Sequence, residues 1–268
     1  MWKKDITARK ELYESYSSYY YSESYKYINP FSWLVLLERR NLLLKLFRMS
    51  IYKNFKLLDI GCADGYFVNI AEKMGSIASI GIDISNNFMK VSRDLSRQNN
   101  LITSHFVCAD AQNLPFREQI FEICILSEVI EHCPEPWKAL KECWKASKNL
   151  CILSVPTGDS LPWVKIIKKI GRFTGIKKDE AGHLHELYFK EVIMKIKELD
   201  LEILDINGVV FLFWTLMAYP IGQISFFKNF LIKVLPKLVS LDLLICSKFP
   251  IAATSVFFRL KKGDASFN

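Results

Sequence analysis

Residues 57–67, which read LLDIGCADGYF, constrain the fold of this chain more than any other segment. An apolar run enters a turn of small residues and an amphipathic stretch follows, so the segment predicts a strand, a tight turn and a helix. Gly61 and Gly65 permit a left-handed backbone and close approach to a ligand, and the free N–H groups of the helix favour an anionic group. With Ala63 between them, the glycines depart from the G-x-G-x-x-G dinucleotide pattern. On this segment alone, an ordinary strand–helix turn remains an alternative.

Three later apolar runs also end in acidic or polar residues, as expected of successive strands of one sheet. Asp83 ends the run in residues 79–85, 18 residues after the second glycine. In nucleotide-binding βαβ units, an acid near this distance binds ribose hydroxyls. Asp110 follows a third run, and residues 127–136 (SEVIEHCPEP) follow a fourth. Because open α/β sheets bind ligands at the carboxyl ends of their strands, the four signals predict one site at that edge.

The turn resembles motif I of the class I S-adenosylmethionine-dependent methyltransferases, usually written (D/E)-x-G-x-G-x-G. The segment around Asp110 looks like the third signature of that family, and the run ending in SEVIEHCPEP resembles its EVLEH-x-x-(D/E)-P stretch. The likeness covers about residues 56–206 and extends to the type 11 methyltransferases and the O-methyltransferase of ubiquinone synthesis. It implies S-adenosylmethionine as cofactor. It also implies an α/β fold with a doubly wound, Rossmann-like, seven-stranded sheet, whose last strand is antiparallel and inserted between the fifth and sixth.

The resemblance also implies roles for eight residues in cofactor binding. The first four would frame the methionine and ribose end, the fifth would bind the ribose diol, and the sixth would lie beside adenine. The last two would meet the adenine amino group and a ring nitrogen. In that order they are Asp59, Gly61, Ala63, Gly65, Asp83, Ile84, Asp110 and Ala111. Ala63 stands where the family has glycine, which would tighten the turn against the cofactor.

Three residues are candidates for catalysis on the acceptor. A hydroxyl acceptor needs a base, and histidine titrates near neutral pH. Glu128 and His132 follow the fourth run, where acceptors bind, and His183 lies in the segment GHLHELY, which resembles the family stretch G-H-x-(R/H)-x-(Y/F). A structural hydrogen bond that fixes the loop is the alternative for His183. No spacing of histidines and acids demands a metal, so no metal site is predicted.

Alternation of strand and helix patterns from 57 to 155 predicts a parallel sheet with helices on both faces. Residues 1–55 are expected to form a helical extension or lid, with a helix at 32–49 that turns leucines inward and Arg39 outward. The methyltransferase domain is expected over 56–262, with insertions at 157–184 and 211–251. Its later elements are expected at 150–155 (strand), 189–199 (helix), 202–210 (strand) and 254–260 (strand).

The two insertions have the composition of surfaces that contact membranes. Residues 165–178 carry six basic residues and no acid, and residues 209–227 carry no charge and many aromatic rings. Pro220 and Gly222 interrupt the second stretch, which favours an apolar cap over a membrane span. A surface helix, a closed lid and a homodimer interface are the alternatives.

Composition agrees with an anionic partner and a reducing compartment. The net charge is +8, and the seven cysteines are scattered without a C-x-x-C pair, so reduced core thiols are expected. The polar, Tyr-rich beginning predicts no secretory leader and a cytoplasmic protein with peripheral membrane contact. The leading hypothesis is methyl transfer to a hydrophobic or lipid-linked small molecule at oxygen. An RNA methyltransferase, which the charge allows but no RNA-binding module supports, and a non-catalytic module with the same fold are the alternatives; no nucleic acid is expected.

Overall fold

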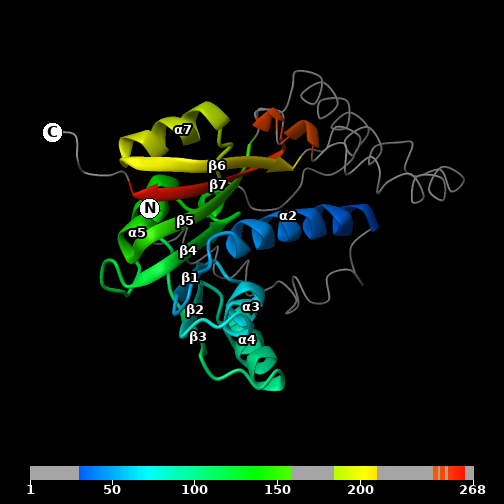
Figure 1. Cartoon of the computed structure of the whole chain (residues 1–268), viewed down its shortest axis with the longest axis vertical. Coiled ribbons are helices and arrows are strands. Elements are labelled where there is room, and N and C mark those ends of the chain that lie inside the picture. Colours follow the sequence, from blue (N-terminus) through cyan, green and yellow to red (C-terminus); the bar gives the residue numbers. More distant parts are fainter. Residues whose placement is uncertain (1–29, 158–183, 210–243, 247, 251–252, 263–268) are drawn as a thin grey trace, which may run out of the picture.

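The part of the chain that the structure describes is built around one mixed sheet with helices packed against it (Figure 1). The computed structural model describes residues 30–157, 184–209, 244–246, 248–250 and 253–262. The interiors of both predicted insertions and residues 1–29 of the predicted extension lie outside these ranges. In the described part, no helix is long and apolar enough to cross a bilayer.

The sheet has seven strands in the order β3-β2-β1-β4-β5-β7-β6. Strands β1 to β5 pair in parallel, whereas β7 pairs antiparallel with both β5 and β6. The insertion of the last strand between the fifth and sixth is therefore confirmed. The strands are β1 Lys56–Ile60, β2 Ala78–Asp83, β3 Ser104–Cys108, β4 Phe121–Ser127, β5 Ser147–Pro156, β6 Leu201–Val209 and β7 Ser255–Lys262.

Helices cover both faces of this sheet, as its apolar strands require. Along β4, Ile123 and Ile125 join the cluster beneath α2 and α3, whereas Cys124 and Leu126 join the cluster beneath α5 and α7. A strand buried on both faces is typical of a parallel sheet. The helices are α2 Pro30–Arg48, α3 Tyr66–Lys73, α4 Asn86–Gln98, the 3-10 helix η2 Ile130–His132, α5 Pro136–Ala146 and α7 Phe189–Glu198.

Residues suited to helix N-termini lie just before or at the first residue of three of these helices. Gly65 precedes α3 with φ of 76°, a left-handed conformation that glycine adopts at low cost. Ser85 caps α4, because its hydroxyl accepts the N–H of Phe88 at 3.3 Å. Pro136 is the first residue of α5, where its fixed φ suits a helix and no N–H bond is lost. The loops of the site are thereby held between rigid elements.

Helix α2 is anchored to the sheet at its carboxyl end. Phe47 is fully buried in the cluster that contains Ile125 and Phe257, and its ring meets Phe55 edge to face at 5.9 Å between centroids. Beyond the helix, Arg259 of β7 donates to the carbonyl of Met49 at 3.1 Å. The part of the extension nearest the domain is therefore a layer of the core.

Phe47→Ala should lower the free energy of unfolding by about 3–5 kcal/mol, because it removes a fully buried ring and leaves a cavity. Met49→Ala is the matched control, since Met49 is 50% exposed and should change stability by less than about 0.5 kcal/mol. Urea denaturation measures both values. Equal effects of the two substitutions would contradict the anchoring of α2.

Candidate functional site

The turn between β1 and α3 has room for glycine and for little else. Gly61 has φ of 73°, and a Cβ atom there would lie 2.3 Å from Cγ2 of Val129. A Cβ atom at Gly65 would lie 2.4 Å from the ring of Phe106. Ala63 has φ of 47°, so its left-handed conformation costs about 1–2 kcal/mol where glycine would adopt it freely. The turn thus packs tightly against β3 and against the segment that follows β4.

Asp83 ties this turn to the end of β2. Its carboxylate accepts the N–H of Ala63 at 3.1 Å and the N–H of Ser85 at 3.0 Å. The carbonyl of Ile82 accepts the N–H groups of Gly61 and Cys62 at 2.8 and 2.9 Å. The two strand ends predicted to share a ligand therefore form one rigid unit.

Three carboxyl groups give this unit an excess of potential negative charge. Asp59 and Asp64 are 4% and 1% exposed, and Asp83 lies beside them. Burial, with smaller contributions from Asp83 and Asp64, raises the pKa of Asp59 from 3.8 to about 8. Asp59 is therefore protonated at neutral pH, and a cationic ligand would favour its ionised form.

Asp110 extends the same edge to the end of β3. Its carboxylate accepts the backbone N–H of Gln112 at 2.8 Å and the side-chain amide of Asn113 at 3.1 Å. The N–H of Ala109 binds the carbonyl of Asp83 at 3.0 Å and joins the third strand end to the second. Ile84 and Ala111 are half-buried on either side of this link. The structure thus gathers the eight predicted cofactor-binding residues at the ends of β1, β2 and β3.

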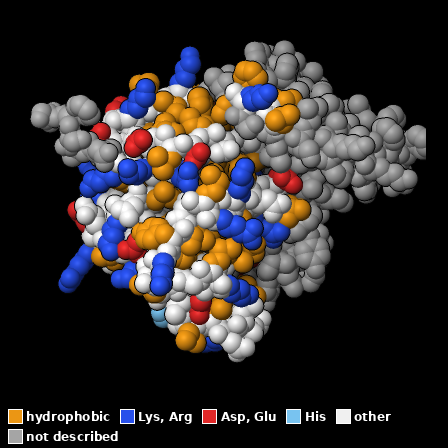
Figure 2. All heavy atoms as spheres, in the orientation of Figure 1, with side chains coloured by type: hydrophobic (Ala, Val, Ile, Leu, Met, Phe, Trp, Pro, Cys, Tyr) orange, Lys and Arg blue, Asp and Glu red, His pale blue; other side chains and the backbone are white. Residues whose placement is uncertain are grey.

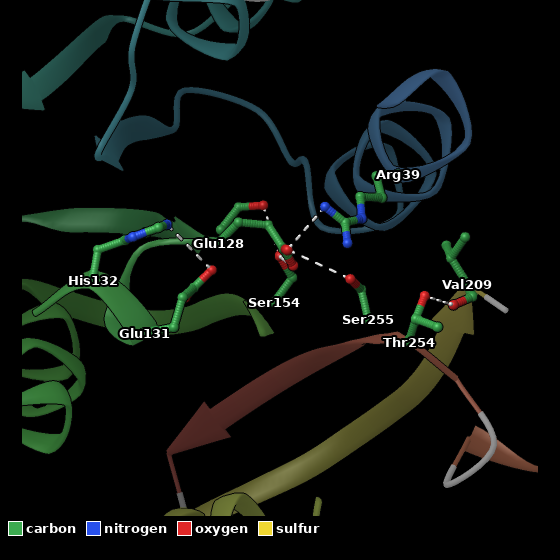
Figure 3. Close-up of polar contacts among 9 residues, drawn as sticks. Arg39, Glu128, Glu131, His132, Ser154, Val209, Thr254 and Ser255 are labelled. Carbon is green, nitrogen blue, oxygen red and sulfur yellow. Dashed lines mark hydrogen bonds and ion pairs between the residues drawn. The ribbon is translucent and has the colours of Figure 1, made fainter. Parts of the chain in front are cut away.

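Glu128 is the centre of a polar network on the acceptor side of the edge (Figure 3). Its carboxylate accepts the hydroxyl of Ser154 at 3.0 Å and that of Ser255 at 3.4 Å, and it pairs with Arg39 Nη1 at 3.2 Å. Glu128 also has a left-handed φ of 54°, and its N–H binds the carbonyl of Ser154 at 3.0 Å. Three donors thus hold a carboxylate that joins β4, β5, β7 and α2.

Arg39, Ser154 and Ser255 are the members of this network that the sequence did not reveal. Arg39 was expected on the outer face of its helix, but its guanidinium points to the sheet edge and only 26% of the side chain is exposed. The correction has a physical reason, because Glu128 provides a charge partner that a helical pattern cannot show. No local motif marks either serine.

His132 lies next to Glu131 in η2, directly after the Glu128 network. Its Nε2 atom is 3.8 Å from Oε1 of Glu131, and 20% of its side chain is exposed. The carbonyl of Glu131 accepts the N–H groups of Leu184 and His185 at 2.9 and 3.3 Å. The segment after the first insertion is therefore attached to η2.

His183, the other predicted base, lies outside the described residues, although the next residue along the chain contacts η2. His185 Nε2 is 3.3 Å from the carbonyl of Pro134. Among the residues that the structure describes, no group of three or more His, Cys, Asp or Glu side chains is arranged to hold a metal ion.

Comparison with known proteins agrees with the motifs. Residues 58–154 match the family described as "Methyltransferase domain". Over 204 residues, covering 76% of this chain and 79% of the relative, the chain is 26% identical to an uncharacterized protein of Methanocaldococcus jannaschii. Over 91 residues, it is 31% identical to a Coxiella burnetii protein named ubiquinone biosynthesis O-methyltransferase. That match spans 34% of this chain and only 38% of the relative.

A solved structure of the same fold aligns with this chain. Magnesium protoporphyrin IX methyltransferase from Synechocystis PCC 6803 with bound SAM aligns with a TM-score of 0.58 over 97% of each chain, at 9% identity. The family match, the strand order and the sequence motifs all agree with the same class of enzyme. The chain carries a class I S-adenosylmethionine-dependent methyltransferase domain, and its cofactor is S-adenosylmethionine.

Asp59→Asn should flatten the dependence of stability on pH. Between pH 3.8 and about 8 the unfolded chain loses the Asp59 proton and the folded chain keeps it, so wild-type stability falls as pH rises. The fall is at most about 1.4 kcal/mol per pH unit within that window. The asparagine side chain has no such proton, so the variant should gain stability relative to wild type from pH 5 to pH 8.

Urea denaturation at four pH values in this range measures the difference. Asp94→Asn is the matched control, because 64% of the Asp94 side chain is exposed, and it should run parallel to wild type. Acids distant from Asp59 contribute equally to every variant and cancel, whereas changes at its neighbours Asp64 and Asp83 are part of the measured difference. A curve for Asp59→Asn parallel to that of wild type would contradict the buried, protonated carboxyl.

Proposed function

We propose that this methyltransferase transfers a methyl group to an oxygen of a hydrophobic or lipid-linked small molecule, with His132 as the general base. The contact of Gly61 with Val129 carries the proposal. A Cβ atom at Gly61 would lie 2.3 Å from Val129, so the segment that holds His132 rests directly on the cofactor turn. A base within one helical turn of that contact is placed to serve an acceptor beside the methyl donor.

The residues of the edge fit the cofactor. S-adenosylmethionine supplies the reactive methyl group on a cationic sulfur and also carries an ammonium group, and both charges suit the carboxyl groups of Asp59, Asp64 and Asp83. Asp83 would bind the ribose diol, because two backbone N–H groups already fix its carboxylate. Asp110 would hold the adenine amino group. The remaining work of the protein is to position the acceptor and to exclude water.

His132 is the better of the two histidine candidates for the base. It is partly exposed at the carboxyl edge, and a neutral imidazole accepts a proton at physiological pH. Glu128 acts differently, because Ser154, Ser255 and Arg39 already engage its carboxylate. We assign Glu128 the role of positioning α2 against β5 and β7. His183 remains the second candidate for the base.

The acceptor class is supported by the name of the Coxiella burnetii relative, which specifies methylation at oxygen in the synthesis of a quinone. The basic and apolar insertions at 157–184 and 211–251 suit a substrate dissolved in an anionic membrane. Lys and Arg side chains are spread over the described face of the molecule in Figure 2, in keeping with the net charge of +8. Peripheral contact with the membrane is therefore part of the proposal.

Calorimetric titration of the cofactor and assays of methyl transfer should distinguish residues that bind the cofactor from residues that act on the acceptor. Asp83→Ala should weaken S-adenosylmethionine binding by about 10- to 100-fold, because charge-assisted hydrogen bonds to the ligand are lost. His132→Gln should bind the cofactor as wild type does and lower methylation of quinol-type acceptors by at least about 100-fold. Full activity of His132→Gln would exclude His132 as the base, and unchanged binding by Asp83→Ala would exclude the ribose assignment.

Wild-type protein should float with vesicles that contain phosphatidylglycerol, and less so as salt increases. Reversing two charges of the second insertion, in Lys233→Glu with Lys237→Glu, should weaken vesicle binding by about 10-fold or more. The matched control reverses two exposed charges of α7, Lys190→Glu with Lys197→Glu, and should have a smaller effect. Wild-type protein that stays with the unbound fraction, or equal losses in both variants, would contradict membrane contact by the insertion.

A further inference from the structure

Glu131 is a buried carboxyl group that the proposed mechanism leaves unexplained. The residue is 0% exposed, and among the described residues neither carboxyl oxygen has a hydrogen-bond partner. Burial, and then the negative charge of Glu128, raise the pKa of Glu131 well above its usual range, whereas Arg39 opposes this more weakly. Burial therefore favours the neutral form of this carboxyl group. A buried polar group without a partner is rare in native proteins and calls for a functional explanation.

His132 is the ring that this carboxyl group faces. Figure 3 shows the two side chains pointing toward each other, with Nε2 of His132 3.8 Å from Oε1 of Glu131. That distance exceeds a hydrogen bond by less than 1 Å. Hydrogen bonds of catalytic groups are often long before the substrate is bound and shorten in the complex. A small rotation of either side chain would bring these two atoms within hydrogen-bond distance, with or without an acceptor.

We propose that Glu131 is a positioning residue for His132, whose Nε2–H it accepts so that Nδ1 is left to take the proton of the acceptor. The inference rests on the proposed function of His132 as the base. The O–H bond of the acceptor breaks, its proton moves to Nδ1, and its electron pair stays on the oxygen, which becomes the nucleophile. Glu131 keeps its own proton throughout and offers the carbonyl oxygen of its carboxyl group.

The neutral state of Glu131 matters for this role. A neutral carboxyl group orients the ring without raising the pKa of the imidazole, whereas an ionised carboxylate beside the ring would favour the imidazolium form. Among the described residues, the charged groups that act on Glu131 are Glu128 at the end of β4 and Arg39 of α2, and these two pair with each other at 3.2 Å. Under this proposal, the acceptor side contains a histidine that a neutral side chain orients.

Two substitutions separate positioning from a structural role. Glu131→Gln keeps a carbonyl oxygen at the same reach, and Glu131→Leu keeps much of the volume without any acceptor. The backbone at this residue is fixed by N–H groups of Leu184 and His185, independently of the side chain. Since Glu131→Leu removes an unpartnered buried polar group, its thermal unfolding should match or exceed that of wild type. Glu118→Gln, at an exposed acid, is the control and should change nothing.

Steady-state kinetics and NMR spectra of these variants test the proposal. Glu131→Leu should lower kcat on the order of 100-fold with an unchanged KM for S-adenosylmethionine. Glu131→Gln should retain most of the wild-type kcat. The acidic limb of its pH–rate profile should have the same midpoint as that of wild type. In ¹⁵N-histidine-labelled protein, which has four histidines, the downfield Nε2–H signal of His132 should persist in Glu131→Gln and vanish in Glu131→Leu. His132→Gln assigns that signal.

The outcomes also separate this inference from the proposed function. The NMR measurement needs neither cofactor nor acceptor, so it decides the positioning role even if every oxygen acceptor tested stays unmethylated. Retention of the Nε2–H signal in Glu131→Leu would overturn the positioning role. So would a loss of kcat in Glu131→Gln as large as in Glu131→Leu. A lower acidic midpoint in Glu131→Gln would show that the carboxyl is ionised, and would overturn the neutral pair.

Discussion

The contact between Gly61 and Val129 is the constraint on which the rest of the site depends. A Cβ atom at Gly61 would lie 2.3 Å from the Val129 side chain. The cofactor turn can therefore lie this close to the segment after β4 only because residue 61 is glycine. Asp83 fixes the turn from the side of β2, and Glu128 fixes the acceptor segment from the side of α2 and β5. These contacts therefore fix the position of the turn after β1 relative to the segment that holds His132.

Charge is distributed differently on the two sides of this contact. The cofactor side concentrates Asp59, Asp64 and Asp83, an arrangement that is unfavourable alone and is relieved by a cationic ligand. On the acceptor side, Arg39 pairs with Glu128, and burial raises the pKa of Glu131. The three acids at the ends of β1 and β2 therefore suit a cationic ligand, whereas the segment after β4 holds a paired and a buried carboxyl group.

Local patterns were sufficient to predict the strands and the edge of the sheet at which their acidic residues lie. Each predicted strand from β1 to β7 agrees with the structure within a few residues, because apolar periodicity and strand-ending motifs are properties of short segments. The placement of β7 came from the family resemblance, since pairing order is not a local property. Asp59, Asp83 and Asp110 lie together as the order of the parallel strands implied.

The acceptor side could be predicted only in part. Glu128 and His132 lie where the motif placed them, but the partners of Glu128 come from α2, β5 and β7, and Ser255 is 127 residues away along the chain. The sequence of a short segment cannot predict a contact between such distant residues, and it cannot predict that Glu131 is fully buried. The role of Arg39 was missed for the same reason. Tertiary packing, which decides burial and charge pairing, is the information that the sequence pattern lacks.

A crystal structure with bound S-adenosylhomocysteine, the demethylated product, would test the central claim most directly. The account predicts the ribose on Asp83, the adenine beside Ile84 and Asp110, and the sulfur directed across the Gly61–Val129 contact toward His132. A product bound at another edge of the sheet, or with its sulfur directed away from η2, would contradict it.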